Sequence, residues 1–236
     1  MADGGGKTKV RGRWRRVRVI ALVVVLIAGA YGIGSSQSVL VRAPLVLGQD
    51  AVTDVQSASV AVTLEDVGGQ VIHIAATGER KVVFIFYPGG LVRPQAYEWL
   101  GRALAAKGVE TWIPVMPFDL AVLGIDRADA IIAHVGTGVP IVIGGHSLGG
   151  AMAADYASRH ASQLKGMVLC AAYPASNVTV SASWPALSLR AGNDGSVHAF
   201  FGRYGPQAGD GVPTVARAAA EQAIINAVTT YVASLA

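Results

Sequence analysis

The pentapeptide Gly145-His146-Ser147-Leu148-Gly149 holds the residues of this chain that are best suited to covalent chemistry. It follows the apolar run at residues 139–144, and residues 148–157 have the composition of a helix. A glycine-flanked serine between a buried strand and a helix is the pattern of a nucleophile elbow. Glycine adopts the strained backbone of such a turn without steric cost. The helix N-terminus would direct backbone N–H groups at an anion beside Ser147.

Apolar runs alternate with helical patterns through most of the chain. Strands are predicted at residues 60–64, 71–75, 81–87, 110–114, 139–143, 166–171 and 184–190, and helices at 94–107, 127–135, 148–160 and 214–235. The first two strands form a hairpin turned at residues 67–70. This alternation predicts the α/β class, with a mainly parallel central sheet flanked by helices. Chemistry in such a sheet collects at the carboxyl ends of the strands, where Gly90, Ser147 and Asp194 fall.

Positive charge is concentrated at the N-terminus. Residues 1–18 contain seven basic side chains against Asp3, a charge of +6, whereas the whole chain carries +4. The rest of the chain therefore carries −2. A basic pI that belongs to a tail gives little support for nucleic-acid binding by the fold, and we expect no nucleic-acid partner.

The segment after the basic tail is long and apolar, since residues 19–34 carry no charge. A span of the hydrocarbon core needs about 20 residues, and a snorkelling Arg18 with Ser35 and Ser36 extends the segment toward that length. We predict a transmembrane anchor at residues 19–36, with the tail at 1–18 in the cytoplasm and the rest of the chain outside the cytoplasmic membrane. The alternative is a signal peptide cleaved near Ala30, which would give a secreted protein.

The remaining chain is predicted to be one domain behind a linker. Residues 37–57 form a linker that can dock on the domain, and residues 58–236 form the domain itself. Cys170 is the only cysteine and falls in an apolar run, so we expect a buried hydrophobe and no intrachain disulfide.

The sequence predicts no cofactor. No cluster of histidine or acidic residues has metal-ligand spacing, and no Gly-Lys-Ser/Thr follows Gly89-Gly90, as a phosphate loop requires. His146 adjoins Ser147 but would point away from it at an elbow, so we expect a structural role. The other histidines outside the motif region are expected to be ordinary strand and helix residues: His73, His134 and His160.

Six blocks of sequence together resemble the α/β-hydrolase superfamily, and more narrowly the membrane-associated bacterial group known as the α/β-hydrolase fold-5 domain. The resemblance covers roughly residues 60–235. Its blocks lie at residues 86–90, 116–121, 144–153, 172–175, 192–195 and 198–211. It implies an α/β-hydrolase fold, and the short stretch at residues 172–183 leaves no room for a lid domain.

The resemblance also implies a role for individual residues. Ser147 takes the place of the nucleophile, His198 that of the base and Asp194 that of the acid. The Leu148 N–H would supply one oxyanion donor, and the loop residue Gly90 would supply the other. Three further residues are predicted to line the substrate site: Tyr87, Leu91 and Tyr173.

One departure concerns the interval between the acid and the base. The resemblance implies another strand and helix there, but only residues 195–197 separate Asp194 from His198. Either one loop carries both residues or the chain has lost a catalytic element. Asp119 and Asp126, after the strand at 110–114, are alternative acids.

Two functions remain open at this point. The first is a membrane-anchored serine hydrolase that cleaves an ester or thioester through an acyl-enzyme, on a small-molecule or surface-presented acyl substrate. The second is a catalytically inactive module of the same fold that serves as a binding or scaffold protein of the cell envelope. The short interval between Asp194 and His198 motivates the second hypothesis.

Overall fold

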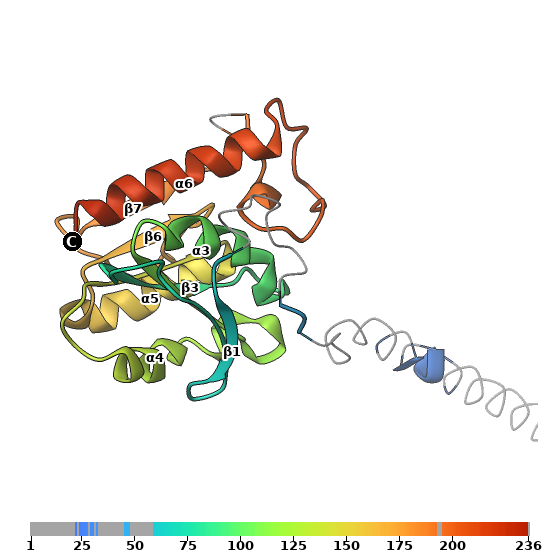
Figure 1. Cartoon of the computed structure of the whole chain (residues 1–236). Helices are drawn as coiled ribbons and strands as arrows, with labels where there is room; N and C mark the ends of the chain where they lie inside the picture. Colours follow the sequence, from blue (N-terminus) through green and yellow to red (C-terminus); the bar gives the residue numbers. More distant parts are fainter. Residues whose placement is uncertain are drawn as a thin grey trace, which may run out of the picture. The chain divides into compact units, whose positions relative to one another are not determined.

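The computed structural model describes residues 22, 24–27, 29, 30, 32, 45–47, 59–192 and 195–235 (Figure 1). Its described residues fold in the element order β1 (Val62–Asp66), β2 (Gln70–Ile74), β3 (Val82–Tyr87), η1 (Pro94–Tyr97), α3 (Glu98–Ala105), β4 (Val109–Pro114), η2 (Pro117–Asp119), η3 (Ala121–Leu123), α4 (Arg127–Val135), β5 (Ile141–His146), α5 (Leu148–His160), η4 (Ala161–Gln163), β6 (Gly166–Cys170), β7 (Ala186–Leu189), η5 (His198–Phe201) and α6 (Arg217–Ala233).

Within that part of the chain, seven strands form one sheet in the order β1-β2-β4-β3-β5-β6-β7. The hairpin β1–β2 is antiparallel and β2 pairs antiparallel with β4, whereas every pair from β4 to β7 is parallel. A parallel sheet must be covered on both faces. β5 is the middle one of the five parallel strands, so the elbow that follows it opens at the middle of their carboxyl edge.

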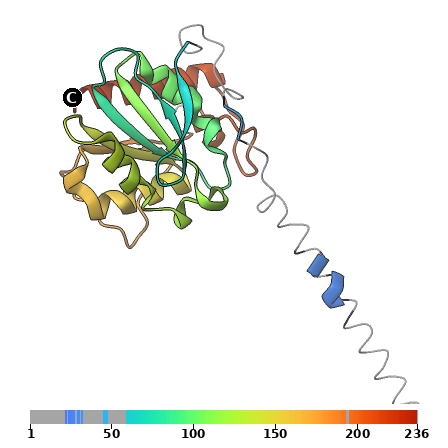
Figure 2. The same ribbon diagram turned by 60° about the horizontal axis from the view of Figure 1, so that its bottom comes forward.

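Helices cover the two faces of the sheet. Figures 1 and 2 show α6, in red, on one side and α4 and α5 on the other. Alternate residues of β3 enter two separate apolar clusters, Phe84 and Phe86 with α6 and Ile85 and Tyr87 with α5. This period of two is the geometry of a strand buried on both faces, and it places the Tyr87 side chain on the α5 side.

The predicted elements are confirmed in type and order, with shifts at their ends. The helix predicted at residues 94–107 divides into η1 and α3 and ends at Ala105, where the turn 106–108 leads into β4. Residues 171–185 contain no helix or strand, as expected for a fold without a lid domain. Between β7 and η5, the described residues contain no further strand, as the short interval predicted.

The predicted anchor lies largely outside the described residues. Of residues 19–36, the structure describes 22, 24–27, 29, 30 and 32, all helical. Among the residues that are described, no helix has both the length and the apolar character to cross a membrane. In the predicted linker, Leu45 and Leu47 are half-buried and pack against the apolar cluster on the α6 face.

Candidate active site

Ser147 lies at the junction of β5 and α5 with φ 52° and ψ −122°. Its backbone N–H donates to the carbonyl oxygen of Cys170 at 3.0 Å, which ties the turn to the end of β6. Left-handed φ is costly for a residue with a Cβ atom. The turn is therefore the strained elbow that the sequence pattern predicted, and it lifts Ser147 out of the strand at the carboxyl edge of the sheet.

Glycine is required at this elbow by close backbone approach. A Cβ atom at Gly149 would lie 2.2 Å from the carbonyl oxygens of Tyr87 and Pro88, and one at Gly145 would lie 2.6 Å from the Tyr87 oxygen. These are backbone atoms, which cannot move aside as a flexible side chain can. The absence of side chains at Gly145 and Gly149 lets α5 approach the end of β3.

Strained backbone is concentrated at this edge. Within the described residues, the non-glycine residues with left-handed φ all follow parallel strands: Leu91 after β3, Phe118 and Asp119 after β4, Ser147 after β5 and Ala171 after β6. Strain of this kind persists where the surrounding structure holds it in place, and it clusters at active sites and ligand-binding loops. Its distribution marks the carboxyl ends of β3 to β6 as the candidate active site.

Two backbone donors flank Ser147. Leu148 opens α5, so its N–H lies among the first amides of the helix, which have no partner within the helix. A Cβ atom at Gly90 would lie 3.1 Å from Cδ2 of Leu148, so the loop after β3 lies directly against that helix start. The next amide, Leu91 N–H, donates to the Asp119 carbonyl at 2.8 Å and fixes the loop. Gly90 and Leu148 therefore lie close together, and their role as oxyanion donors stays a prediction.

A cavity of about 410 Å³ opens over Ser147. Three of its walls come from the loop after β3, the elbow and the segment that follows β7. Its lining residues are Gly89, Gly90, Leu91, Val92, His146, Ser147, Leu148, His198, Tyr204, Pro206, Gln207 and Ala208. The predicted nucleophile, base and oxyanion donors therefore share one cavity, although β6 separates β5 from β7 in the sheet.

His198 is half-buried at the start of η5, with its ring centroid 4.4 Å from that of His146. Burial lowers the pKa of His198, and the negative charge of Asp210 opposes that shift. The net pKa lies below the ordinary histidine value, so the imidazole is neutral at pH 7 and can accept a proton.

His146 is buried and held by a tyrosine. The Tyr97 hydroxyl accepts the Gly89 N–H at 2.9 Å, so it donates its own proton to Nδ1 of His146 at 2.9 Å. Burial, with a smaller contribution from His198, lowers the pKa of His146 to about 3. A neutral histidine that accepts this hydrogen bond fixes the floor of the cavity, which agrees with the structural role expected from the sequence.

The segment that carries His198 is anchored to α6. The Arg217 guanidinium donates to the carbonyl oxygens of Ala199 and Gly202 and lies 4.5 Å from the centre of the Phe200 ring. Arg203 pairs with Glu221 at 2.7 Å. These contacts hold η5 against the helix, so the position of His198 depends on the C-terminal part of the chain.

Of the three residues predicted to line the substrate site, one lines the cavity and two do not. Leu91 lines the cavity, but Tyr173 is 80% exposed and outside it. Tyr87 is buried on the α5 face, where its hydroxyl donates to Ile125 O and accepts from Ala128 N–H. Tyr87 therefore packs beneath the site and does not line the cavity.

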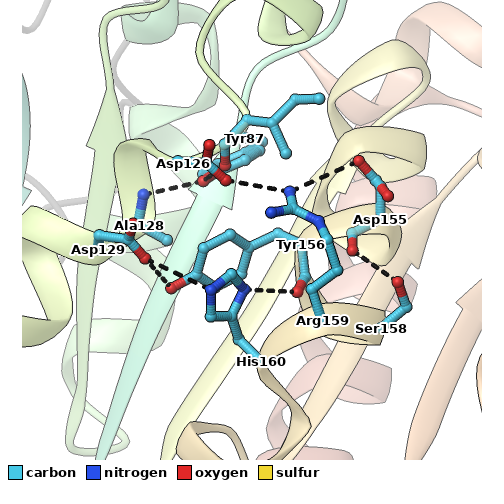
Figure 3. A network of polar contacts seen from close by, with 10 residues as sticks. Tyr87, Asp126, Ala128, Asp129, Asp155, Tyr156, Ser158, Arg159 and His160 are labelled. Carbon is cyan, nitrogen blue, oxygen red and sulfur yellow. Dashed lines mark hydrogen bonds and ion pairs between the residues drawn. The ribbon is translucent and has the colours of Figure 1, made fainter.

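The alternative acids contact arginines. Asp119 is buried and pairs with Arg93 at 3.3 Å, which supports the loop that carries Gly90. Asp126 pairs with Arg159 at 3.0 Å in the network between α4 and α5 that Figure 3 shows. Neither lines the cavity over Ser147.

Asp194 lies outside the described residues. A carboxylate that the sequence reasoning did not assign, Asp210, accepts the Ala199 N–H at 2.8 Å. Its signal in the sequence was only its place in the resembling block at 198–211. Among the residues that the structure describes, no group of histidine, cysteine or acidic side chains could hold a metal ion.

Comparison with curated protein sequences finds no match. The family described as "Alpha/beta hydrolase family" matches residues 83–197, a segment that contains Ser147 and ends one residue before His198.

Solved structures similar to this chain include a hormone-sensitive lipase from a metagenome library, with 20% identity and a TM-score of 0.40 over 48% of this chain and 44% of that chain. Another is the thioesterase domain from the curacin biosynthetic pathway, with 21% identity and a TM-score of 0.39 over 47% of this chain and 46% of that chain. A thermostable carboxyl esterase from Bacillus coagulans has 15% identity and a TM-score of 0.39 over 48% and 44%. The matched part spans less than half of each of these chains.

Proposed function

We propose that this chain, whose residues 83–197 match the α/β-hydrolase family, is a serine hydrolase that cleaves an ester or thioester through an acyl-enzyme. The observation that carries this proposal is the strained Ser147 at the floor of a cavity that His198 also lines. A serine needs an adjacent base to become a nucleophile. His198 is the proposed base, and the N–H groups of Gly90 and Leu148 are the proposed oxyanion donors. All three residues line the same cavity as Ser147.

The proposed reaction has two halves. Ser147 Oγ attacks the acyl carbon while His198 takes the hydroxyl proton, and the N–H groups of Gly90 and Leu148 stabilise the oxyanion. His198 then gives the proton to the leaving alcohol or thiol, whose bond to the acyl carbon breaks. Water, deprotonated by His198, cleaves the acyl-enzyme and returns Ser147 to its starting state. The sequence assigns the acid that orients His198 to Asp194.

The substrate class follows from the shape of the entrance. The cavity is about 410 Å³, and residues 171–185 place no helix or strand over it. Leu91, half exposed at the rim, offers an apolar contact. These features favour a small acyl group, or an acyl group presented on a larger surface, over a long chain that needs an enclosed tunnel.

Membrane attachment is part of the proposal. The supports are the seven basic residues before residue 19 and the apolar side chains of Leu22 and residues 24–27, which are each more than half exposed. Exposed apolar side chains in such a run favour a hydrocarbon environment over water. The proposed topology places the N-terminus in the cytoplasm and the hydrolase domain outside the cytoplasmic membrane. Secretion after cleavage near Ala30 remains the alternative.

Fluorophosphonate labelling tests the catalytic proposal. The probe phosphonylates an activated serine with loss of fluoride, so wild-type protein should become labelled, whereas Ser147→Ala and His198→Ala should not. The matched control is His160→Ala, because His160 binds the Tyr156 carbonyl on α5 and does not line the cavity. Labelling that persists in Ser147→Ala would refute the proposal. A folded wild-type protein that resists the probe would instead favour the inactive binding module.

A further inference from the structure

The segment between β7 and α6 closes on itself. Thr214 N–H donates to the Gly195 carbonyl oxygen at 2.9 Å, so the two ends of the segment meet. His198 lies just inside one end, and Asp210 lies on the arm that returns toward α6. Closure of the loop therefore brings the arm that carries Asp210 back toward the arm that carries His198, although the two residues are well separated in the sequence.

The Asp210 carboxylate contacts the backbone beside the proposed base. Its Oδ2 accepts the N–H of Ala199, the residue directly after His198, at 2.8 Å. Its charge also acts on two residues that line the cavity. Burial lowers the pKa of His198 and the Asp210 charge opposes this, while burial and then the same charge raise the pKa of Tyr204 to about 12. Asp210 thus contacts the backbone next to His198, and its charge acts on both His198 and Tyr204.

We infer that Asp210 is the positioning acid of His198, in the role that the sequence assigns to Asp194. One carboxylate oxygen holds the η5 backbone, and within the described residues no hydrogen bond to the other oxygen, Oδ1, is found. That oxygen is the acceptor for Nδ1–H of His198, which leaves Nε2 to take the Ser147 proton. The Asp210 carboxylate stabilises the imidazolium, while the proton passes from Ser147 through His198 to the leaving group.

The Asp210 assignment accounts for a triad in a chain whose described residues lack the strand and helix expected between the acid and the base. A separate strand and helix would normally set the distance between acid and base, but none lies between β7 and η5 in the described chain. The returning arm brings the Asp210 carboxylate to the Ala199 N–H, directly next to His198 in the chain. The inference rests on the proposed function, because it names the residue through which that site's base is held.

Other ionisable groups also face His198. The His146 ring lies 4.4 Å away, Tyr204 shares the cavity, and the Arg217 guanidinium binds the Ala199 carbonyl. These groups remain when Asp210 is changed. The difference between wild type and an Asp210 variant therefore reports the carboxylate charge.

Asp210→Asn in the full-length protein, in detergent micelles, isolates that charge. An asparagine carbonyl can still accept the Ala199 N–H, so the loop keeps its backbone contact. The matched control is Asp155→Asn, which removes a carboxylate that pairs with Arg159 on α5 outside the cavity. Asp194→Asn tests the competing assignment. Melting temperatures verify that each variant is folded.

Two readouts distinguish this inference from the proposed function. The first is the pH dependence of fluorophosphonate inactivation, for which we expect Asp210→Asn to lower the rate about tenfold or more and to move the acid limb to lower pH. The second is an NMR titration of His198, assigned with His198→Gln, in which the pKa should fall by roughly half a unit or more. The titration requires no activity, so it tests the inference even if no serine is labelled.

The opposite results are equally specific. A His198 titration unchanged by Asp210→Asn would overturn the inference. Loss of labelling confined to Asp194→Asn would also overturn it, because the acid would then be the residue that the sequence assigned. Labelling that does not depend on Ser147 would overturn the proposed function alone.

Discussion

Ser147→Gly should make the protein more stable than Ser147→Ala. Both variants lack the hydroxyl, so neither can form an acyl-enzyme and the lost polar contacts cancel in the comparison. They differ in the backbone, because φ at this position is 52° and ψ is −122°. Alanine carries the same Cβ strain as serine, whereas glycine adopts this conformation freely.

The magnitude follows from two opposing contributions. A non-glycine residue in a sparsely populated region costs about 1–3 kcal/mol, which glycine relieves. Glycine also gives the unfolded chain more conformational freedom, which costs about 0.5–1 kcal/mol. The net expectation is a gain of about 1 kcal/mol, with an upper limit of about 2.5 kcal/mol, or a rise in melting temperature of roughly 2–4 °C for a gain of about 1 kcal/mol in a domain of this size. Ser147 is only partly buried, so loss of the alanine methyl has little effect on packing.

Urea unfolding followed by tryptophan fluorescence measures the difference, since Trp99 and Trp112 are buried in opposite clusters. The control is the same pair of substitutions at Ser158, inside α5. There glycine should be the less stable residue, by about 1 kcal/mol, because helix φ does not require it. If Ser147→Gly were also less stable than Ser147→Ala, the elbow would not be strained and the reasoning would fail.

The remaining predictions concern packing and pH. Gly149→Ala should lower the free energy of unfolding by about 3 kcal/mol or more, because its Cβ would lie 2.2 Å from two backbone oxygens. Gly211→Ala is the control, since its Cβ would meet nothing within 4 Å, and it should change the free energy of unfolding by no more than about 0.5 kcal/mol. Equal losses for the two variants in urea unfolding would contradict the close approach at Gly149. His73 lies 2.7 Å from both Glu65 and Glu110; burial alone would lower its pKa, but these hydrogen bonds outweigh burial and raise it. The stability that wild type has over His73→Gln should therefore be complete below the unfolded histidine pKa, near pH 6.5, and decline as pH rises through the raised folded value. An advantage that grows with pH would refute this.

Much of the candidate site was predictable because its signals are local. The elbow needs an apolar strand, small residues on both sides of a serine and a helix, and all three lie within about twenty consecutive residues. The predicted Ser147, Gly90, Leu148 and His198 all line one cavity in the structure. Tyr87 was predicted to line the site, but alternation along β3 turns its side chain toward α5.

The sequence by itself determined the elements and the reactive turn, since apolar periodicity and glycine placement act over a few residues. Only the tertiary structure brings the Asp210 carboxylate to the segment that carries His198. Asp210 reaches the Ala199 N–H because the loop closes between Gly195 and Thr214 and because α6 holds η5 through Arg217. Such closure depends on contacts between segments distant in the chain, which leave no periodic pattern in the sequence.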